Sequence, residues 1–101
     1  MLIVIGEAEA APGRRDQMLE AVAAMATATQ SDEGCESYGF YADVTRPEVL
    51  LSVEVWRDRA ALDAHMAHAH TQQFLATVPD LVAGDPAMRF FHAEPVQEAA
   101  R

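Results

Sequence analysis

The chain has 101 residues, of which 50% are hydrophobic and 23% charged, a balance typical of a single folded domain. Sixteen acidic residues against seven basic ones, all arginine, give a formal net charge of -9. This charge disfavours binding to nucleic acid or to an anionic membrane. Because a chain this short buries only roughly two thirds of its surface on folding, we expect it to form an oligomer.

No long apolar segment is present in the sequence. The longest apolar run covers residues 1–5, far short of the roughly 20 residues that span a membrane. The same run lacks the basic start and the small-residue cleavage site of a signal peptide. The single cysteine, Cys35, cannot form an internal disulfide and is expected to pack as a small apolar residue. We therefore expect a cytoplasmic protein.

The first part of the chain predicts a strand followed by a helix. Residues 2–10 begin as a β-branched run and then alternate, which indicates a strand, and residues 11–13 break it. Residues 14–30 are rich in alanine and predict a helix. Its apolar stripe has helical spacing and consists of Met18, Val22, Met25 and Thr29. The helix is expected to end at residues 31–34, where Gly34 supplies a permissive backbone.

The middle of the chain predicts a hairpin. Residues 35–44 are rich in aromatic side chains, which favour a strand, and residues 45–48 form a turn. Residues 49–56 predict the next strand. Because the connection is short, the two strands are expected to be antiparallel.

The last part of the chain predicts a second helix and a fourth strand. Asp58 is a good N-cap for a helix over residues 59–70, which continues less regularly towards Pro79. Residues 87–94 predict the last strand, and residues 95–101 a polar tail. A single domain is therefore expected over residues 1–94.

The order of these elements is β-α-β-β-α-β, which predicts a ferredoxin-like α+β fold. Right-handed crossovers place both helices on one face of a four-stranded antiparallel sheet. The other face of the sheet is then uncovered.

The third strand has two faces of different character. We expect its aliphatic side chains to pack on the helices: Val49, Leu51, Val53 and Val55. The alternate side chains are then expected on the uncovered face: Leu50, Ser52, Glu54 and Trp56. A second subunit on that face would enclose a cavity with apolar walls and a few polar groups, as small-molecule sites have. Alternatively, Glu54 is an exposed carboxylate and Trp56 a core residue of the dimer.

Several short motifs carry a family resemblance. They read EGCESY at residues 33–38, VEVW at 53–56, ALDAH at 61–65 and HTQQF at 70–74. Together with Pro12-Gly13, they resemble the antibiotic biosynthesis monooxygenase domain family over residues 2–94. The resemblance implies a dimeric α+β barrel, with a pocket between the sheet and the helices of each subunit.

The resemblance also implies a range of activities. The family includes cofactor-free quinol and polyketide monooxygenases, haem-degrading enzymes and an autoinducer-processing branch. The haem-degrading branch uses an asparagine of the first strand, and some polyketide oxygenases use one in the pocket. This chain contains no asparagine, so haem degradation is not expected.

Two histidines are the candidate catalytic bases. His65 lies on the expected inner stripe of its helix with Leu62 and Met66, and His70 lies about 140° further around an ideal helix. An imidazole suits a general base or a donor to a substrate oxygen. His65 would otherwise be a structural residue between the helix and the sheet.

A metal site is not expected. The histidine spacings of three and five residues differ from the i, i+4 pattern that places two ligands on one helix face. Only Asp63 and His92 offer further ligands that could be near.

Other candidate residues would bind or stabilise the substrate. Trp56 and Tyr38 provide flat walls for an aromatic ring, and Phe74 lies in the core or touches the ligand. Glu54 either holds the tautomer of a histidine or pairs with an arginine across the dimer. Arg89 either stabilises an anionic intermediate or forms a salt bridge at the surface or interface.

The preferred function is cofactor-independent oxidation of a small aromatic quinol or polyphenol by O2. The sequence lacks a glycine-rich phosphate loop, a Cys-x-x-Cys pair and a Gly-x-Ser-x-Gly elbow, so nucleotide, flavin and acyl-transfer chemistry have no support. One alternative is a non-catalytic dimer that binds a small ligand. Another is a cofactor-free isomerase of the autoinducer-processing type, which oxygen dependence would distinguish from the oxygenase.

Overall fold

A computed structural model describes residues 1–97 of the chain. The elements follow the predicted order, with the second helix divided into parts. They are β1 (Leu2–Glu9), α1 (Arg15–Thr29), β2 (Cys35–Ala42), β3 (Val49–Trp56), α2 (Arg59–Ala67), α3 (Ala69–Thr77), a 3-10 turn (Val78–Asp80) and β4 (Ala87–His92). The predicted boundaries agree with these to within about two residues at most ends.

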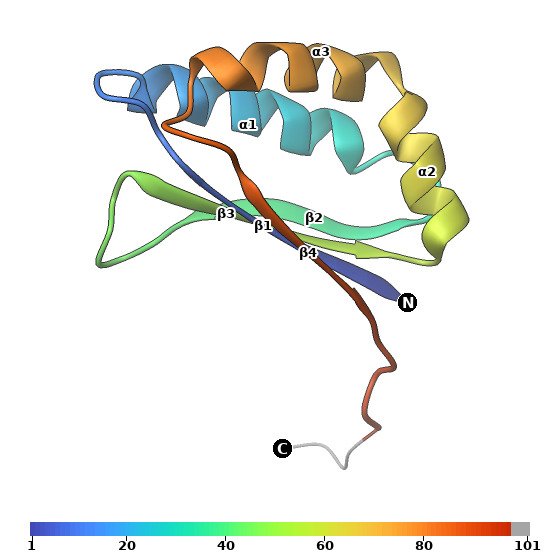
Figure 1. Cartoon of the computed structure of the whole chain (residues 1–101). Coiled ribbons are helices and arrows are strands. Elements are labelled where there is room, and N and C mark those ends of the chain that lie inside the picture. The colour runs from blue at the N-terminus through green and yellow to red at the C-terminus, as the bar shows by residue number, and fades with distance from the viewer. Residues whose placement is uncertain (98–101) are drawn as a thin grey trace.

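The four strands form one antiparallel sheet in the order β2-β3-β1-β4. This is the ferredoxin-like α+β arrangement that the element order predicts. All three helices lie on the same side of the sheet (Figure 1). Residues 95–97 of the predicted tail have no regular structure, and residues 98–101 lie outside the described part of the chain.

Helix α1 packs on the sheet through the stripe that its spacing predicts. Its buried residues are Met18, Val22, Met25 and Thr29. Gly34, in the turn that follows, has φ +78°, a conformation that glycine adopts without strain. The turn therefore brings residues 31–34 close beneath α2, where a side chain on Gly34 would collide with Ala61.

The second predicted helix is interrupted. Asp58 caps α2 as expected, because its Oδ1 accepts a hydrogen bond from the Ala61 N–H at 2.9 Å. His68 has an extended backbone with ψ 148°, which ends α2 and starts α3 in a new direction. His65 and His70 therefore lie on different helices, and the separation of about 140° expected for one ideal helix does not describe them.

The predicted orientation of β3 is wrong. The side chains of Leu50, Ser52, Glu54 and Trp56 are buried beneath the helices, whereas Leu51, Val53 and Val55 are only half-buried. Trp56 packs with Met25 and Leu62, and Leu50 packs with Met18 and Val22. The mixed polar and apolar face of β3 therefore belongs to the core of this one chain.

The opposite face of the sheet, here called the outer face, is mainly apolar. The strand register places Ile3 beside Val55 and Phe91, and Ile5 beside Val53 and Arg89. Phe91 is 44% exposed in the single chain. The helices leave this face open (Figure 1).

None of the helices among the described residues is both long and apolar enough to cross a membrane.

Candidate functional site

A cavity of about 460 Å³ lies between the sheet and the helices of the chain. The inner faces of the strands form its floor, and α1, α2 and α3 form its roof. Its walls are mostly apolar and include four methionines: Met18, Met25, Met66 and Met88. A cavity of this size and character suits a small, largely apolar ligand.

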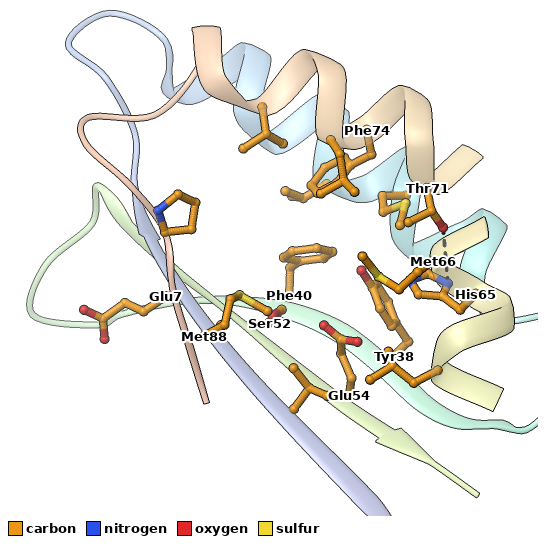
Figure 2. Close-up of a pocket in the computed structure, with 18 of the residues that line it drawn as sticks. Glu7, Tyr38, Phe40, Ser52, Glu54, His65, Met66, Thr71, Phe74 and Met88 are labelled. Atoms are coloured by element: carbon orange, nitrogen blue, oxygen red, sulfur yellow. Dashed lines mark hydrogen bonds between the residues drawn. The ribbon is translucent and has the colours of Figure 1, made fainter. Parts of the chain in front are cut away.

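Polar side chains gather at one end of this cavity. Tyr38 of β2, Glu54 of β3 and His65 of α2 lie together there (Figure 2). Tyr38 and Glu54 are paired across neighbouring strands, so both point to the helix side of the sheet. Burial, and then the nearby Glu54 charge, raises the pKa of the Tyr38 hydroxyl, which keeps it protonated and able to donate.

His65 is held on one side by a buried carboxylate. Its Nδ1 lies 2.7 Å from Oδ2 of Asp32, in the turn after α1, and 3.3 Å from Oγ1 of Thr71 (Figure 2 shows the Thr71 contact). Nε2 has no hydrogen-bond partner among the described residues and is not fully buried. Burial lowers the pKa of His65, while the Asp32 hydrogen bond opposes that shift. The imidazole is therefore kept neutral near pH 7 with Nε2 open.

Two further histidines surround the same carboxylate. Nε2 of His70 lies 3.1 Å from Oδ2 of Asp32, and Nε2 of His68 lies 3.7 Å from Oδ1. The rings of His68 and His70 stack with centroids 5.3 Å apart. His65 and Asp32 are almost fully buried, whereas His70 is partly exposed and His68 more so. The cluster therefore runs from the cavity wall to the solvent.

Trp56 supports this end of the cavity from behind. Its Nε1–H donates to Oε1 of Glu54 at 3.0 Å, and its ring centroid lies 4.6 Å from that of His65. The indole is fully buried and does not line the cavity. The prediction that Trp56 forms a wall of the site is therefore wrong, because the indole is used to hold Glu54 and His65.

Glu54 does not hold a histidine as the sequence suggested. Its carboxyl group binds the Trp56 indole, and burial raises its pKa despite that bond. The histidine partner is Asp32 instead.

Phe74 lies on the roof of the cavity as one of the predicted contacts. It faces Phe40 of β2 with ring centroids 6.0 Å apart (Figure 2). Together with Tyr38, Glu54 and His65, it makes four predicted site residues that line the cavity. His70 does not line the cavity and reaches it only through Asp32.

Arg89 lies away from the site. Its register partner is Ile5, which places it on the outer face, where its guanidinium lies 5.9 Å from the centroid of the Phe91 ring. Its neighbours Met88 and Phe90 point into the cavity instead. Arg89 is therefore not available to an intermediate bound beside His65 in the same chain.

Asp32 is the main residue of the site that the sequence did not identify. It falls in the stretch that predicts the end of α1, and 33 residues separate it from His65. Ser52, which was expected on the uncovered face, lines this cavity instead, and Thr71, which also lines it, had no role in the sequence analysis. A turn carries no local pattern that predicts a contact across such a separation, so only the folded structure reveals it.

A metal cluster was not expected, and the histidines do group with a carboxylate. The ligand atoms of Asp32, His65 and His70 lie within 4.8 Å of one another. Asp63 and His92, the partners that the sequence suggested, do not belong to this group. Asp63 is paired with Arg59 instead, at 3.1 Å.

Cys35 packs against the core as expected. It is half-buried beside the cluster that contains Tyr38 and Trp56. Burial raises the pKa of its thiol, which disfavours the nucleophilic thiolate.

Known proteins resemble this chain in sequence. A sequence model of the antibiotic biosynthesis monooxygenase family matches residues 1–77. Protein sll1783 of Synechocystis sp. is 31% identical over 90 residues, which are 89% of this chain and 61% of that protein. The protein named "Putative monooxygenase Rv0793" of Mycobacterium tuberculosis is 32% identical over 89 residues, 88% of this chain and 85% of its own length.

Solved structures resemble the chain in fold. The structure of Rv0793 matches with a TM-score of 0.86 at 29% identity and covers 98% of both chains. A structure from Deinococcus radiodurans matches with a TM-score of 0.90 over 99% of both chains. That pair is 23% identical, so the likeness is one of fold. From the family match and the relative that is 32% identical, we conclude that this chain belongs to the antibiotic biosynthesis monooxygenase family.

Proposed function

We propose that this chain is a cofactor-independent monooxygenase that oxidises a small aromatic quinol or polyphenol with O2. One observation carries the proposal: a buried histidine lies on the wall of a largely apolar cavity, and its Nε2 has no hydrogen-bond partner in the described part of the chain. A quinol or polyphenol carries its own reducing electrons. The protein then needs to supply a base, a dry pocket and a means of orienting the ring.

The lining of the cavity supports this choice of substrate. Its apolar walls suit the faces of one or two fused rings, and Phe40 and Phe74 offer aromatic contacts. The protonated Tyr38 hydroxyl and the Glu54 carboxyl supply hydrogen bonds at the His65 end. A dihydroxylated ring would therefore bind with one hydroxyl at His65.

The reaction begins with proton transfer to Nε2 of His65. The phenolic O–H bond breaks, and the phenolate that remains passes one electron to O2. The two radicals combine to form a carbon–oxygen bond, and the imidazolium returns its proton to the outer peroxide oxygen. Loss of water from this hydroperoxide leaves a carbonyl group. One oxygen atom of O2 enters the product and the other leaves as water.

The apolar cavity favours these charge movements. The apolar walls offer few hydrogen bonds to water, so a bound ring would leave little solvent beside the phenolate and imidazolium, and their electrostatic interaction would be stronger than in solution. The lowered pKa of His65 keeps its base form populated at neutral pH.

We also propose that the protein works as a homodimer in the cytoplasm, with the outer face of the sheet as the contact. Ile3, Ile5, Val53 and Val55 are half-buried on that face, and Phe91 beside Ile3 is 44% exposed; a contiguous apolar surface of this kind is typical of an interface. The partners proposed are a second copy, the aromatic substrate and O2, with no nucleic acid and no membrane.

The test is oxygen uptake with menadiol, prepared without air and corrected for autoxidation. We expect uptake above the autoxidation rate, and a loss of about 100-fold or more in His65→Gln, in the range for a general base. His92→Gln is the matched control, because His92 is exposed and does not line the cavity. The control should keep its full rate.

Four outcomes would contradict the proposal. Uptake at the autoxidation rate would remove this substrate class, and an unchanged rate in His65→Gln would remove His65 as the base. Ligand conversion without O2 uptake would favour the isomerase, and binding without any conversion would favour the small-ligand-binding protein.

A further inference from the structure

Asp32 is a buried carboxylate whose surroundings are three imidazoles. Its side chain is 7% exposed, and both of its oxygens face histidine nitrogens. Oδ2 of Asp32 lies 2.7 Å from Nδ1 of His65 and 3.1 Å from Nε2 of His70. Oδ1 lies 3.7 Å from Nε2 of His68. A carboxylate removed from water is costly unless hydrogen-bond donors compensate it. The histidines therefore supply the hydrogen bonds that compensate the burial of the Asp32 carboxylate.

The short distance from Asp32 to His65 distinguishes a hydrogen bond from a shared metal ion. Ligand atoms that lie about 2.0–2.1 Å from a tetrahedral zinc ion are roughly 3.3 Å apart from one another. The separation of 2.7 Å between Nδ1 and Oδ2 is too short for that arrangement and fits a charge-assisted N–H···O bond. Such a bond to a carboxylate requires the proton on Nδ1 of His65, which leaves the lone pair on Nε2.

We propose that Asp32 is the positioning residue of this site: it fixes His65 with Nδ1–H towards the carboxylate and Nε2 towards the cavity, and it stabilises the imidazolium that forms when Nε2 takes a proton. This inference rests on the proposed function, since it concerns the base of that reaction. It explains why the sequence places an acidic residue in the turn beneath α2. A histidine oriented by a carboxylate on its far nitrogen is a recurrent arrangement for a general base.

His70 completes the arrangement on the solvent side. Its Nε2–H donates to the same oxygen that His65 uses, so it holds the carboxylate in place and shields it from water. The groups around His65 that carry or gain charge are then Asp32, His68 and His70 on one side and Tyr38 and Glu54 on the cavity side.

The first test needs no substrate and no mutation. Two-bond ¹H–¹⁵N correlation spectra of the imidazoles identify which ring nitrogen of His65 carries the proton. We expect the Nδ1–H tautomer, with its N–H resonance shifted downfield by the carboxylate. The Nε2–H tautomer in the wild-type protein would overturn the proposal, whether or not the protein consumes oxygen.

The second test compares Asp32→Asn with Glu33→Gln. Glu33 is the neighbouring carboxylate, is 90% exposed and lies 3.8 Å from Arg57, so its variant removes the same charge away from His65. In Asp32→Asn we expect menadiol oxidation to fall about 100-fold or more, and the acid limb of the pH–rate profile to move to lower pH. Glu33→Gln should change neither, and Asp32→Glu should recover part of the rate.

The outcomes separate the two proposals. The expected tautomer without oxygen uptake would leave Asp32 as the positioning residue of a histidine that serves another reaction. A rate loss in Asp32→Asn with the acid limb unmoved would indicate a structural effect and contradict the proposal. Wild-type binding of added Zn²⁺ that Asp32→Asn abolishes, with loss of the His65 N–H resonance, would replace the positioning role with a metal site. If Asp32→Asn does not fold, the tautomer of His65 in the wild-type protein still tests whether Asp32 is the positioning residue.

Discussion

The two faces of the sheet reverse the usual relation between polarity and burial. On the helix side, β3 presents a hydroxyl, a carboxylate and an indole, and all three are buried. On the outer face, the same strand presents Val53 and Val55, which remain partly exposed in the single chain. A solid core would need aliphatic side chains beneath the helices. A core that encloses a polar-ended cavity also takes polar side chains, beside apolar ones such as Leu50. The aliphatic side chains of the outer face are those that the proposed second copy would cover.

The largest expected effect concerns two neighbouring residues on opposite faces. Trp56→Ala removes a fully buried indole that contacts His65 and Glu54, so we expect the free energy of unfolding to fall by about 3–5 kcal/mol. Val55→Ala removes two methyl groups, so about 0.8 kcal/mol is expected for the half-buried side chain of the single chain, rising to about 1.6 kcal/mol where the proposed second copy covers it. Urea titrations of both variants measure the two values. Equal losses would contradict the assignment of the faces.

A second prediction concerns the outer face. Val53→Asp places a carboxylate in the proposed dimer contact, beside Ile5. Light scattering with size exclusion should give twice the 11.0 kDa chain mass for the wild type and the chain mass for the variant. Val44→Asp is the control, because Val44 is 97% exposed in the loop after β2. A wild-type protein at the mass of one chain would disprove the dimer.

The smallest expected effect concerns the buried carboxyl group of the inner face. Burial raises the pKa of Glu54 above its ordinary 4.5, so the folded protein binds this proton more tightly than the unfolded chain does. The stabilisation is complete below pH 4.5 and is lost as the pH rises through the folded-state pKa. Glu54→Gln should remove that decline from the pH dependence of unfolding, whereas the exposed Glu36→Gln should keep it. A decline of the wild-type size in Glu54→Gln would assign the effect to another group.

Much of the fold was predictable because its signals are local. The stripe on α1 repeats at helical spacing, and Asp58 and Gly34 mark a helix start and a helix end within a few residues. The family motifs contain Tyr38, Glu54 and His65, and these do line one cavity.

The orientation of β3 was not predictable from its own alternation. Both of its faces contain apolar side chains, and the alternation fixes which residues share a face but not which face meets the helices. The same applies to β4, where Arg89 lies between two residues that point into the cavity. Assigning such faces requires the whole register of the sheet.

The partnership of His65 with Asp32 and His70 depends on contacts between distant parts of the chain. The break between α2 and α3 at His68 turns His70 back towards Asp32. Histidine is not a residue type from which a helix break can be predicted. The turn at residues 31–34 then sets the carboxylate beneath α2. The sequence contains both histidines as candidates, but their shared carboxylate follows only from the tertiary structure.

The four cavity methionines allow the most direct measurement of the central claim, that an aromatic quinol binds between the sheet and the helices of one chain. Menadiol would be titrated without oxygen into protein labelled with ¹³C at the methionine methyl groups. Ring currents should shift the resonances of Met18, Met25, Met66 and Met88, and should leave Met1, which does not line the cavity, unmoved. Saturating quinol that leaves the four cavity resonances in place, or shifts only Met1, would contradict the account.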